Sequence, residues 1–179
     1  MFLTVIKPPN NAGTALSALK HQLYLETGLL SAGALAPMVP VALSSEVKTG
    51  LISKNLPRLP EEGLQLESVR MLRGQLCLAS DGLESFCEDI EGVLKGLGGY
   101  KRSFCSLHLA ECRSEGRSSG ASTAAAKLVR ELPQSVKTWK SCSLEIYRFE
   151  DEPFADPDWW KRVVYETVCS VRFRKAQKR

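Results

Sequence analysis

The stretch FCSLHLAEC, residues 104–112, has the length and the apolar composition of a β-strand. The stretch MVPVALS, residues 38–44, has the same character, although Pro40 cannot donate to a neighbouring strand and therefore suits an edge or a bulge. Each of the two follows an earlier strand and a helical pattern, so both halves of the chain have the order strand, helix, strand. This order predicts an α+β fold in which helices cover one side of mostly antiparallel sheets. We expect 38–44 and 104–112 to be central strands of two neighbouring sheets.

Working outward, the clearest helix begins at Asp81, which can act as an N-cap, and ends at Gly98 and Gly99. Apolar spacing predicts two more helices over residues 12–28 and 124–132. Further strands are predicted at 2–6, 64–72, 75–79, 142–149 and 165–173, with 64–72 and 75–79 forming a hairpin. Irregular structure is predicted for 45–63, a mobile loop for about 113–121, and a helix or turn for 156–160.

The chain has 179 residues, of which 44% are hydrophobic and 25% charged, and this composition is typical of one folded soluble domain. We predict a single domain of two lobes over residues 1–179. The formal net charge is +4, but five positive charges lie in the basic tail 172–179, so the remainder is almost neutral. No apolar run reaches the length of a membrane span, and the first six residues are too short for a signal peptide. We therefore expect a cytoplasmic protein that does not enter a membrane.

Six cysteines lie far apart inside apolar segments, which predicts six free thiols: Cys77, Cys87, Cys105, Cys112, Cys142 and Cys169. No metal site and no cofactor is predicted, because the chain has no CxxC pair and has two histidines outside ligand spacing. The glycines at 96–99 follow a helix instead of opening one, so they indicate a helix end and not a phosphate loop. The acidic run from Glu150 to Asp158 is interrupted by prolines and is expected to be a solvated loop.

The order of elements resembles that of the two-histidine (2H) phosphoesterases, which include RNA 2',3'-cyclic phosphodiesterases. In that family two similar lobes each present a strand with His-x-Thr or His-x-Ser, and the motifs face each other across a groove. Residues 104–111 lie where the second motif would fall, and residues 38–44 where the first would fall. The resemblance implies a groove between two lobes, and it implies a nucleotide or an RNA end as the ligand.

The diagnostic residues differ from the family pattern. Residues 38–44 contain no histidine, and the second segment has Ser106-Leu107-His108, the reverse of His-x-Ser. Ser106 and His108 would still share one face of a strand, which makes them the candidate catalytic pair, whereas Glu111 would lie on the opposite face. His21 lies on the first predicted helix and is expected to be a surface side chain.

Cyclic phosphodiesterase chemistry needs one group to take a proton from water and a second to protonate the leaving oxygen. With one imidazole missing, we expect a divergent 2H-like protein without the two-histidine reaction, which binds a nucleotide, an RNA end or another phosphorylated small molecule. Two alternatives stay open. One is a protein-interaction or structural module that uses Trp159-Trp160 or the basic tail, although one ring of such a pair is usually buried. The other is an active phosphodiesterase in which His108 works with a non-histidine partner.

Overall fold

The structure is a computed structural model that describes residues 1–47, 49–95, 100–113, 118–150, 153, 158–162 and 164–175. Its largest sheet has the order β10-β9-β1-β2-β6, and a three-stranded sheet has the order β4-β5-β7. The first sheet consists of β1 (Phe2–Lys7), β2 (Val39–Ser44), β6 (Tyr100–Arg102), β9 (Ser143–Phe149) and β10 (Tyr165–Arg172). The second consists of β4 (Ser68–Leu72), β5 (Gln75–Ala79) and β7 (Leu107–Glu111). A two-stranded ladder joins β3 (Leu64–Gln65) to β8 (Thr138–Trp139).

The helices are α1 (Asn10–Thr27), α2 (Thr49–Asn55), α3 (Asp81–Lys95), α4 (Ser118–Glu131) and α5 (Gln134–Lys137), with short 3₁₀ turns η1 (Leu30–Gly33) and η2 (Trp159–Arg162). All named strand pairs are antiparallel, so the predicted α+β class is confirmed. The arrangement as two similar lobes stays a prediction. Among the helices that the structure describes, none combines the length and the apolarity needed to cross a bilayer.

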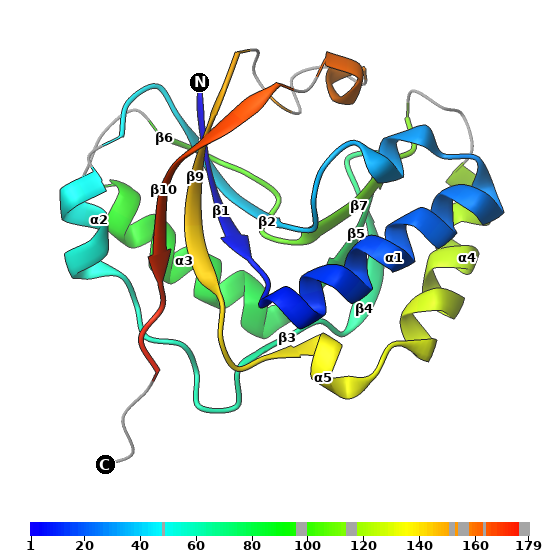
Figure 1. The fold of residues 1–179 in the computed structure, drawn as a ribbon, viewed down its shortest axis with the longest axis horizontal. Coiled ribbons are helices and arrows are strands. Elements are labelled where there is room, and N and C mark those ends of the chain that lie inside the picture. The colour runs from blue at the N-terminus through cyan, green and yellow to red at the C-terminus, as the bar shows by residue number, and fades with distance from the viewer. Residues whose placement is uncertain are drawn as a thin grey trace.

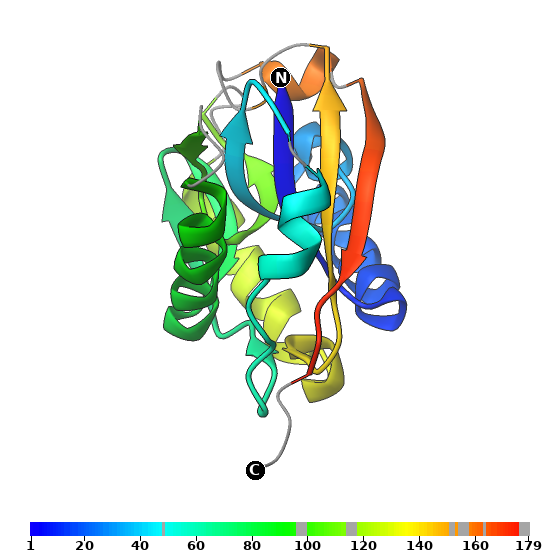
Figure 2. The same ribbon diagram turned by 90° about the vertical axis from the view of Figure 1, so that its left-hand side faces the viewer.

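The five-stranded sheet has two differently covered faces. Figure 2 shows β2, β1, β9 and β10 side by side, with α2 in front of them. In Figure 1, α1 and α4 lie together on the other side, next to the three-stranded sheet. The sheet face that α2 covers belongs to the main core, which includes Ile52 of α2. This core continues to the apolar residues of α1, α3 and β7. The opposite face carries a second core of Leu3, Val5, Leu35, Met38, Leu43, Tyr147, Phe149 and Trp159. This second core lies beside the candidate site described below.

The structure contains several of the predicted elements. Helix α1 covers the predicted 12–28 region and ends at Gly28, which adopts the left-handed conformation with φ 73° that glycine tolerates best. Strands β4 and β5 form the predicted hairpin, and both turn residues, Arg73 and Gly74, have positive φ as a type I′ turn requires. None of the six cysteines forms a disulfide, as predicted.

Other predictions are wrong in ways that tertiary pairing explains. The predicted strand 64–72 is two strands, because β3 pairs with β8 while β4 pairs with β5. The predicted irregular region 45–63 contains α2, and the predicted loop 113–121 overlaps α4, which begins at Ser118; residues 114–117 lie outside the described part of the chain. Strand β2 is interior as expected, but β7 is an edge strand of its sheet and not a central one.

Pro40 marks a bulge in the interior of the sheet. The register between β1 and β2 shifts between Thr4 and Val5, where Val5 pairs with Pro40. The Pro40 carbonyl accepts a hydrogen bond from Cys105 N at 2.9 Å, so the segment between β6 and β7 continues alongside β2 past the proline. The sequence pattern predicted an edge or a bulge, and the structure has the bulge.

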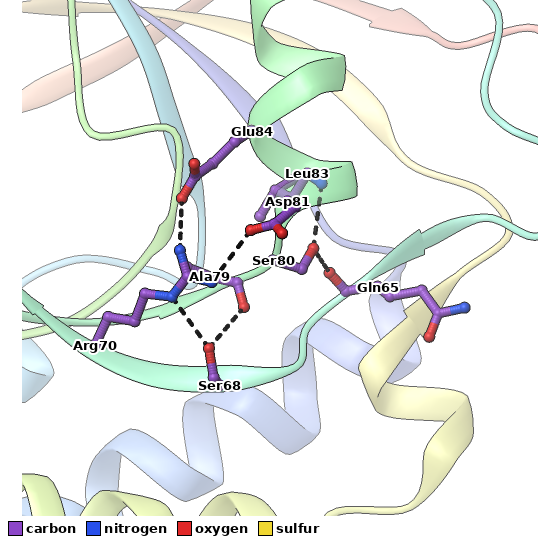
Figure 3. A network of polar contacts seen from close by, with 8 residues as sticks. All are labelled: Gln65, Ser68, Arg70, Ala79, Ser80, Asp81, Leu83 and Glu84. Carbon is purple, nitrogen blue, oxygen red and sulfur yellow. Dashed lines mark hydrogen bonds and ion pairs between the residues drawn. The ribbon is translucent and has the colours of Figure 1, made fainter.

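The N-terminus of α3 is held by a polar network that also ties β3 to β4 (Figure 3). The cap is Ser80 and not the predicted Asp81: Ser80 Oγ accepts a hydrogen bond from Leu83 N at 3.1 Å and donates one to Gln65 O at 2.5 Å. Arg70 of β4 reaches the Asp81 and Glu84 carboxylates of the first helical turn at 3.3 and 3.1 Å. Because these three side chains are all at least partly exposed, the cap contributes more to stability than the ion pairs do.

Replacing Ser80 by alanine is expected to lower the free energy of unfolding by about 1 kcal/mol, which is the usual cost of losing a serine N-cap. Urea denaturation measures the difference. Ser17→Ala, at an exposed position within α1, is the matched control and should change stability by less than about 0.5 kcal/mol. Equal effects of the two substitutions would contradict the assignment of the cap to Ser80.

Candidate functional site

The two residues predicted to be catalytic, Ser106 and His108, are both buried. Their exposed fractions are 0% and 1%. His108 lies in β7 opposite Cys77 of β5, and its backbone N–H points to Met38 O at 3.4 Å, which links β7 to the residue just before β2. The Ser106 hydroxyl adjoins the Cys77 thiol, so both candidates border the same residue of β5. The structure therefore brings them together, but in the interior of the protein.

A bulge in β7 changes which side chains accompany His108. Cys77 pairs with His108 while Leu76 pairs with Ala110, which leaves Leu109 as the extra residue. In a regular strand, residues three positions apart point to opposite faces, but the extra residue of the bulge brings them to the same face. Glu111 therefore lies on the same face of β7 as His108, and the prediction of opposite faces is wrong. Glu111 is 1% exposed and accepts a hydrogen bond from the side chain of Gln75, its cross-strand partner.

Trp159 of η2 covers this polar face. Its ring meets the His108 ring edge to face, with 5.8 Å between the centroids and 68° between the planes. Trp159 also lies near the Glu111 carboxyl group and acts to lower its pKa, although this influence is smaller than that of burial. Trp159 is 4% exposed, whereas Trp160 is half-buried with the Lys161 ammonium 5.5 Å from its ring centre. The expectation that one ring of the tryptophan pair is buried is confirmed, and Trp159 itself is no surface for a partner.

Lys20 of α1 approaches the same cluster from the helix side. It is 2% exposed, and Nζ donates a hydrogen bond to the backbone oxygen of His108 at 3.2 Å. Burial lowers the pKa of Lys20 to about 7, and the partly compensating influence of the Cys77 thiol is smaller. The Lys20 ammonium is therefore costly in this position, and about half of the molecules carry the neutral amine near pH 7.

The other titratable groups of the cluster also favour their uncharged forms. Burial lowers the pKa of His108 well below its ordinary value, and the charge of Lys20 lowers it further. Burial raises the pKa of Cys77 to about 12 and raises the pKa of Glu111 from its ordinary value. Burial thus disfavours the charged form of each of these groups, and the cluster offers a phosphoryl group no solvent-exposed base.

The segment expected to carry the first motif supplies no proton-transfer group. Val39, Val41 and Ala42 of β2 face the main core, and Met38 and Leu43 belong to the second core. The chain's other histidine, His21, is exposed on α1 beside Tyr24, with 6.2 Å between ring centroids. The two imidazoles are thus on different elements and in opposite environments, so they do not form a facing pair.

The acidic run is only partly within the described residues. Glu150 is exposed, and Asp158 pairs with Lys161 at 2.9 Å, while Asp151, Glu152 and Asp156 lie outside the described ranges. Among the residues that are described, no three His, Cys, Asp or Glu side chains converge in the manner of a metal site.

A second polar region was not found by sequence reasoning. A hollow of about 600 Å³ opens where β1 leads into α1 and where β9 and β10 lie beside it. Lys7, Arg172 and Lys175 contribute three cations to its lining against the carboxylate of Glu145. Glu145 is 6% exposed and is held by Lys7 at 3.2 Å and by the Tyr147 hydroxyl at 2.6 Å.

Two of these cations, Arg172 and Lys175, belong to the predicted basic tail 172–179. Instead, Arg172 ends β10 opposite Ser143, and Phe173 is buried and packs against Phe86 with 5.2 Å between ring centroids. Lys175 forms an isolated bridge with Leu59, and residues 176–179 lie outside the described part of the chain. The signal that could have found this is Phe173, an apolar residue among basic ones, which anchors the segment to the core.

In comparisons with known proteins, no family model matches this chain and no curated protein matches it.

Proposed function

We propose that this protein binds a phosphorylated small molecule of the nucleotide class without hydrolysing it, on a scaffold that resembles the 2H phosphoesterases. The observation that carries the proposal is the separation of the two polar regions. The histidine expected in the groove is sealed beneath Trp159, while cations gather at the open hollow formed by β1, β9 and β10. Binding and proton transfer would need to meet in one place for hydrolysis, and here they do not.

The hollow has the chemistry that a phosphate monoester requires. Arg172 and Lys175 are exposed, and within the described residues neither forms an ion pair, so both can donate charge-assisted hydrogen bonds to phosphate oxygens. Glu145, held by Lys7 and Tyr147, is an acceptor for a sugar hydroxyl or a base amino group. The volume of about 600 Å³ is sufficient for a mononucleotide.

The first test is turnover. Wild-type protein is expected to hydrolyse 2',3'-cyclic AMP no faster than a His108→Ala variant, because loss of one of two proton-transfer groups ordinarily reduces the rate by about 10²- to 10⁴-fold. Product formation followed by chromatography measures both. Robust turnover by the wild type that disappears in His108→Ala would overturn the proposal in favour of an active enzyme with a single histidine.

The second test is binding. Calorimetric titration is expected to show that 5'-AMP binds and that adenosine binds at least tenfold more weakly. The double variant Arg172→Gln/Lys175→Gln should weaken AMP binding by roughly 10- to 100-fold, the usual cost of losing charge-assisted hydrogen bonds. Lys127→Gln/Arg130→Gln removes two exposed cations from α4 and is the matched control.

Equal affinities for AMP and adenosine, or equal losses in the two double variants, would contradict a phosphate site at the hollow. If neither turnover nor binding is found, the hypothesis of an interaction or structural module on the same scaffold gains support. That module would have to use a surface other than Trp159, which is 4% exposed.

A further inference from the structure

A second cavity, separate from the cationic hollow, lies between α1 and the turn that follows it. Its volume is about 350 Å³, at the lower end of the range of roughly 300–1,000 Å³ for small-molecule sites. Lys20, His21 and Tyr24 line it from the helix, and Leu30 and Leu35 line it from the segment around η1. Nothing in the proposed function uses these side chains in a ligand site.

Lys20 lines this cavity although only 2% of the residue is exposed, which places it at the inner end. An ammonium group has three donors, and the acceptor identified for Lys20 is the His108 carbonyl oxygen at 3.2 Å. Within the described residues no carboxylate lies at ion-pair distance from Lys20. A buried cation that lacks a counter-charge is strongly destabilising, and an anion bound at the cavity would relieve that cost.

The outer part of the cavity is mainly apolar. Leu30 is 59% exposed and Tyr24 is 37% exposed, and Leu35 belongs to the second core. Exposed apolar side chains of this size around a concave site are typical of a surface that covers the apolar body of a ligand. One buried cation beneath an apolar mouth matches a ligand with one anionic end.

We propose that the cavity between α1 and the segment around η1 binds a small organic carboxylate, with its anionic group against Lys20 and its apolar body against Tyr24 and Leu30. This assignment does not depend on the nucleotide site at the hollow. The carboxylate contributes a counter-charge, which no described residue supplies to Lys20, and a further acceptor beside the His108 carbonyl oxygen.

The titration of Lys20 gives the proposal a distinctive signature. Around pH 8 the ligand-free protein holds Lys20 mostly as the neutral amine, because its pKa is about 7. A bound carboxylate stabilises the ammonium, so binding at pH 8 takes up close to one proton per ligand, and affinity falls about tenfold for each pH unit above 7. The titratable and charged groups on α1 and on the described elements that pack around Lys20 are Cys77, His108, Glu111, His21, Tyr24, Glu26, Lys127, Arg130, Glu131 and Lys137. The variant Lys20→Met distinguishes the titration of Lys20 from that of these groups, because it leaves all of them in place.

The probe is phenylacetate, with phenylacetamide as a neutral molecule of nearly the same shape. Calorimetry at pH 6.5 and at pH 8, in buffers of different protonation enthalpy, measures affinity and proton uptake together. Phenylacetate is expected to bind at least tenfold more tightly than the amide at pH 6.5. Lys20→Met should abolish this difference, and the matched variant Lys127→Met on α4 should keep it.

Three outcomes would overturn the proposal: equal affinities for the acid and the amide, binding without proton uptake at pH 8, or unchanged binding by Lys20→Met. The proton uptake is measured on the wild type and therefore does not depend on how the variant folds. Inorganic phosphate that binds as tightly as phenylacetate would also overturn it, because the apolar mouth would then contribute nothing.

Discussion

Lys20→Met is expected to raise the free energy of unfolding at pH 7 by about 1–4 kcal/mol, the range of gains found when buried ionic groups are replaced by well-packed apolar side chains of similar volume. The methionine fills most of the same volume and removes the desolvated ammonium. The loss of the hydrogen bond to His108 O offsets part of the gain, by about 1 kcal/mol. Urea denaturation of both proteins measures the difference.

The gain is expected to depend on pH in a way that identifies Lys20 as its source. Its pKa is 10.5 in the unfolded chain and about 7 in the folded protein, so the unfolded state holds more protons between these values. Wild-type stability contributed by this group therefore rises with pH from about 7 to 10.5. The advantage of Lys20→Met is largest at pH 7 and below and shrinks toward pH 9.

Lys127→Met, at an exposed position on α4, is the control and should change stability by less than about 0.5 kcal/mol at every pH. If the difference between wild type and Lys20→Met were constant from pH 7 to 9, Lys20 would not be the buried titrating group.

Trp159→Ala is expected to lower the free energy of unfolding by about 3–5 kcal/mol, because a nearly buried indole is removed from the second core. The same change uncovers His108, whose ring packs against the indole at 5.8 Å between centroids. Water that reaches the imidazole reduces the desolvation that holds the pKa of His108 far below 6.5. The pKa of His108 in the variant is therefore expected to rise toward its ordinary value.

Urea denaturation gives the stability change, and the ring signals of His108 followed by NMR between pH 4 and 8 give its titration. Trp160→Ala is the matched control, since Trp160 is only half-buried, and it should cost less stability and leave the His108 titration unchanged. An unaltered titration of His108 in Trp159→Ala would show that another part of the core keeps the ring dry.

Trp159→Ala also separates two reasons for inactivity. If the absent histidine in residues 38–44 prevents turnover, the opened site should still leave 2',3'-cyclic AMP intact. Hydrolysis that appears in Trp159→Ala and is lost again with His108→Ala would instead mean that the tryptophan alone blocks the reaction.

Sequence patterns identified the helices in which apolar spacing and the residues at the ends are both visible in the segment itself. Helix α3 was predictable because apolar residues recur along one of its faces, and five of them, Leu83, Phe86, Cys87, Ile90 and Leu94, are buried in the structure. Helix α1 was predictable because its apolar spacing ends at a glycine. The cap of α3 was misplaced by one residue, since Ser80 and Asp81 are both good caps and only the contact with Leu83 N distinguishes them. Helix α2 was missed because seven residues are too few for a periodic signal.

The candidate site was predictable in part. His108 and Ser106 were chosen because they were expected to share a strand face, and both do border Cys77. Lys20 and the hollow with Arg172 and Lys175 could not be found in this way, because each depends on contacts between distant segments: Lys20 bonds to His108, 88 residues away, and the hollow joins Arg172 and Lys175 to Lys7. The charge count along the sequence predicted that Arg172 belongs to a basic tail, because it contains no information about the pairing of Arg172 with Ser143.

The sequence by itself determined the α+β class, the positions of α1 and α3 and the absence of a second imidazole at residues 38–44, since each depends on residue types and local spacing. The tertiary structure alone decided that Leu109 bulges, that Glu111 turns to the side of His108, and that Trp159 covers both. It also decided that Lys20 is buried without a carboxylate among the described residues. Strand register and burial depend on which distant segments meet, and the ionisation of a buried group follows from that burial.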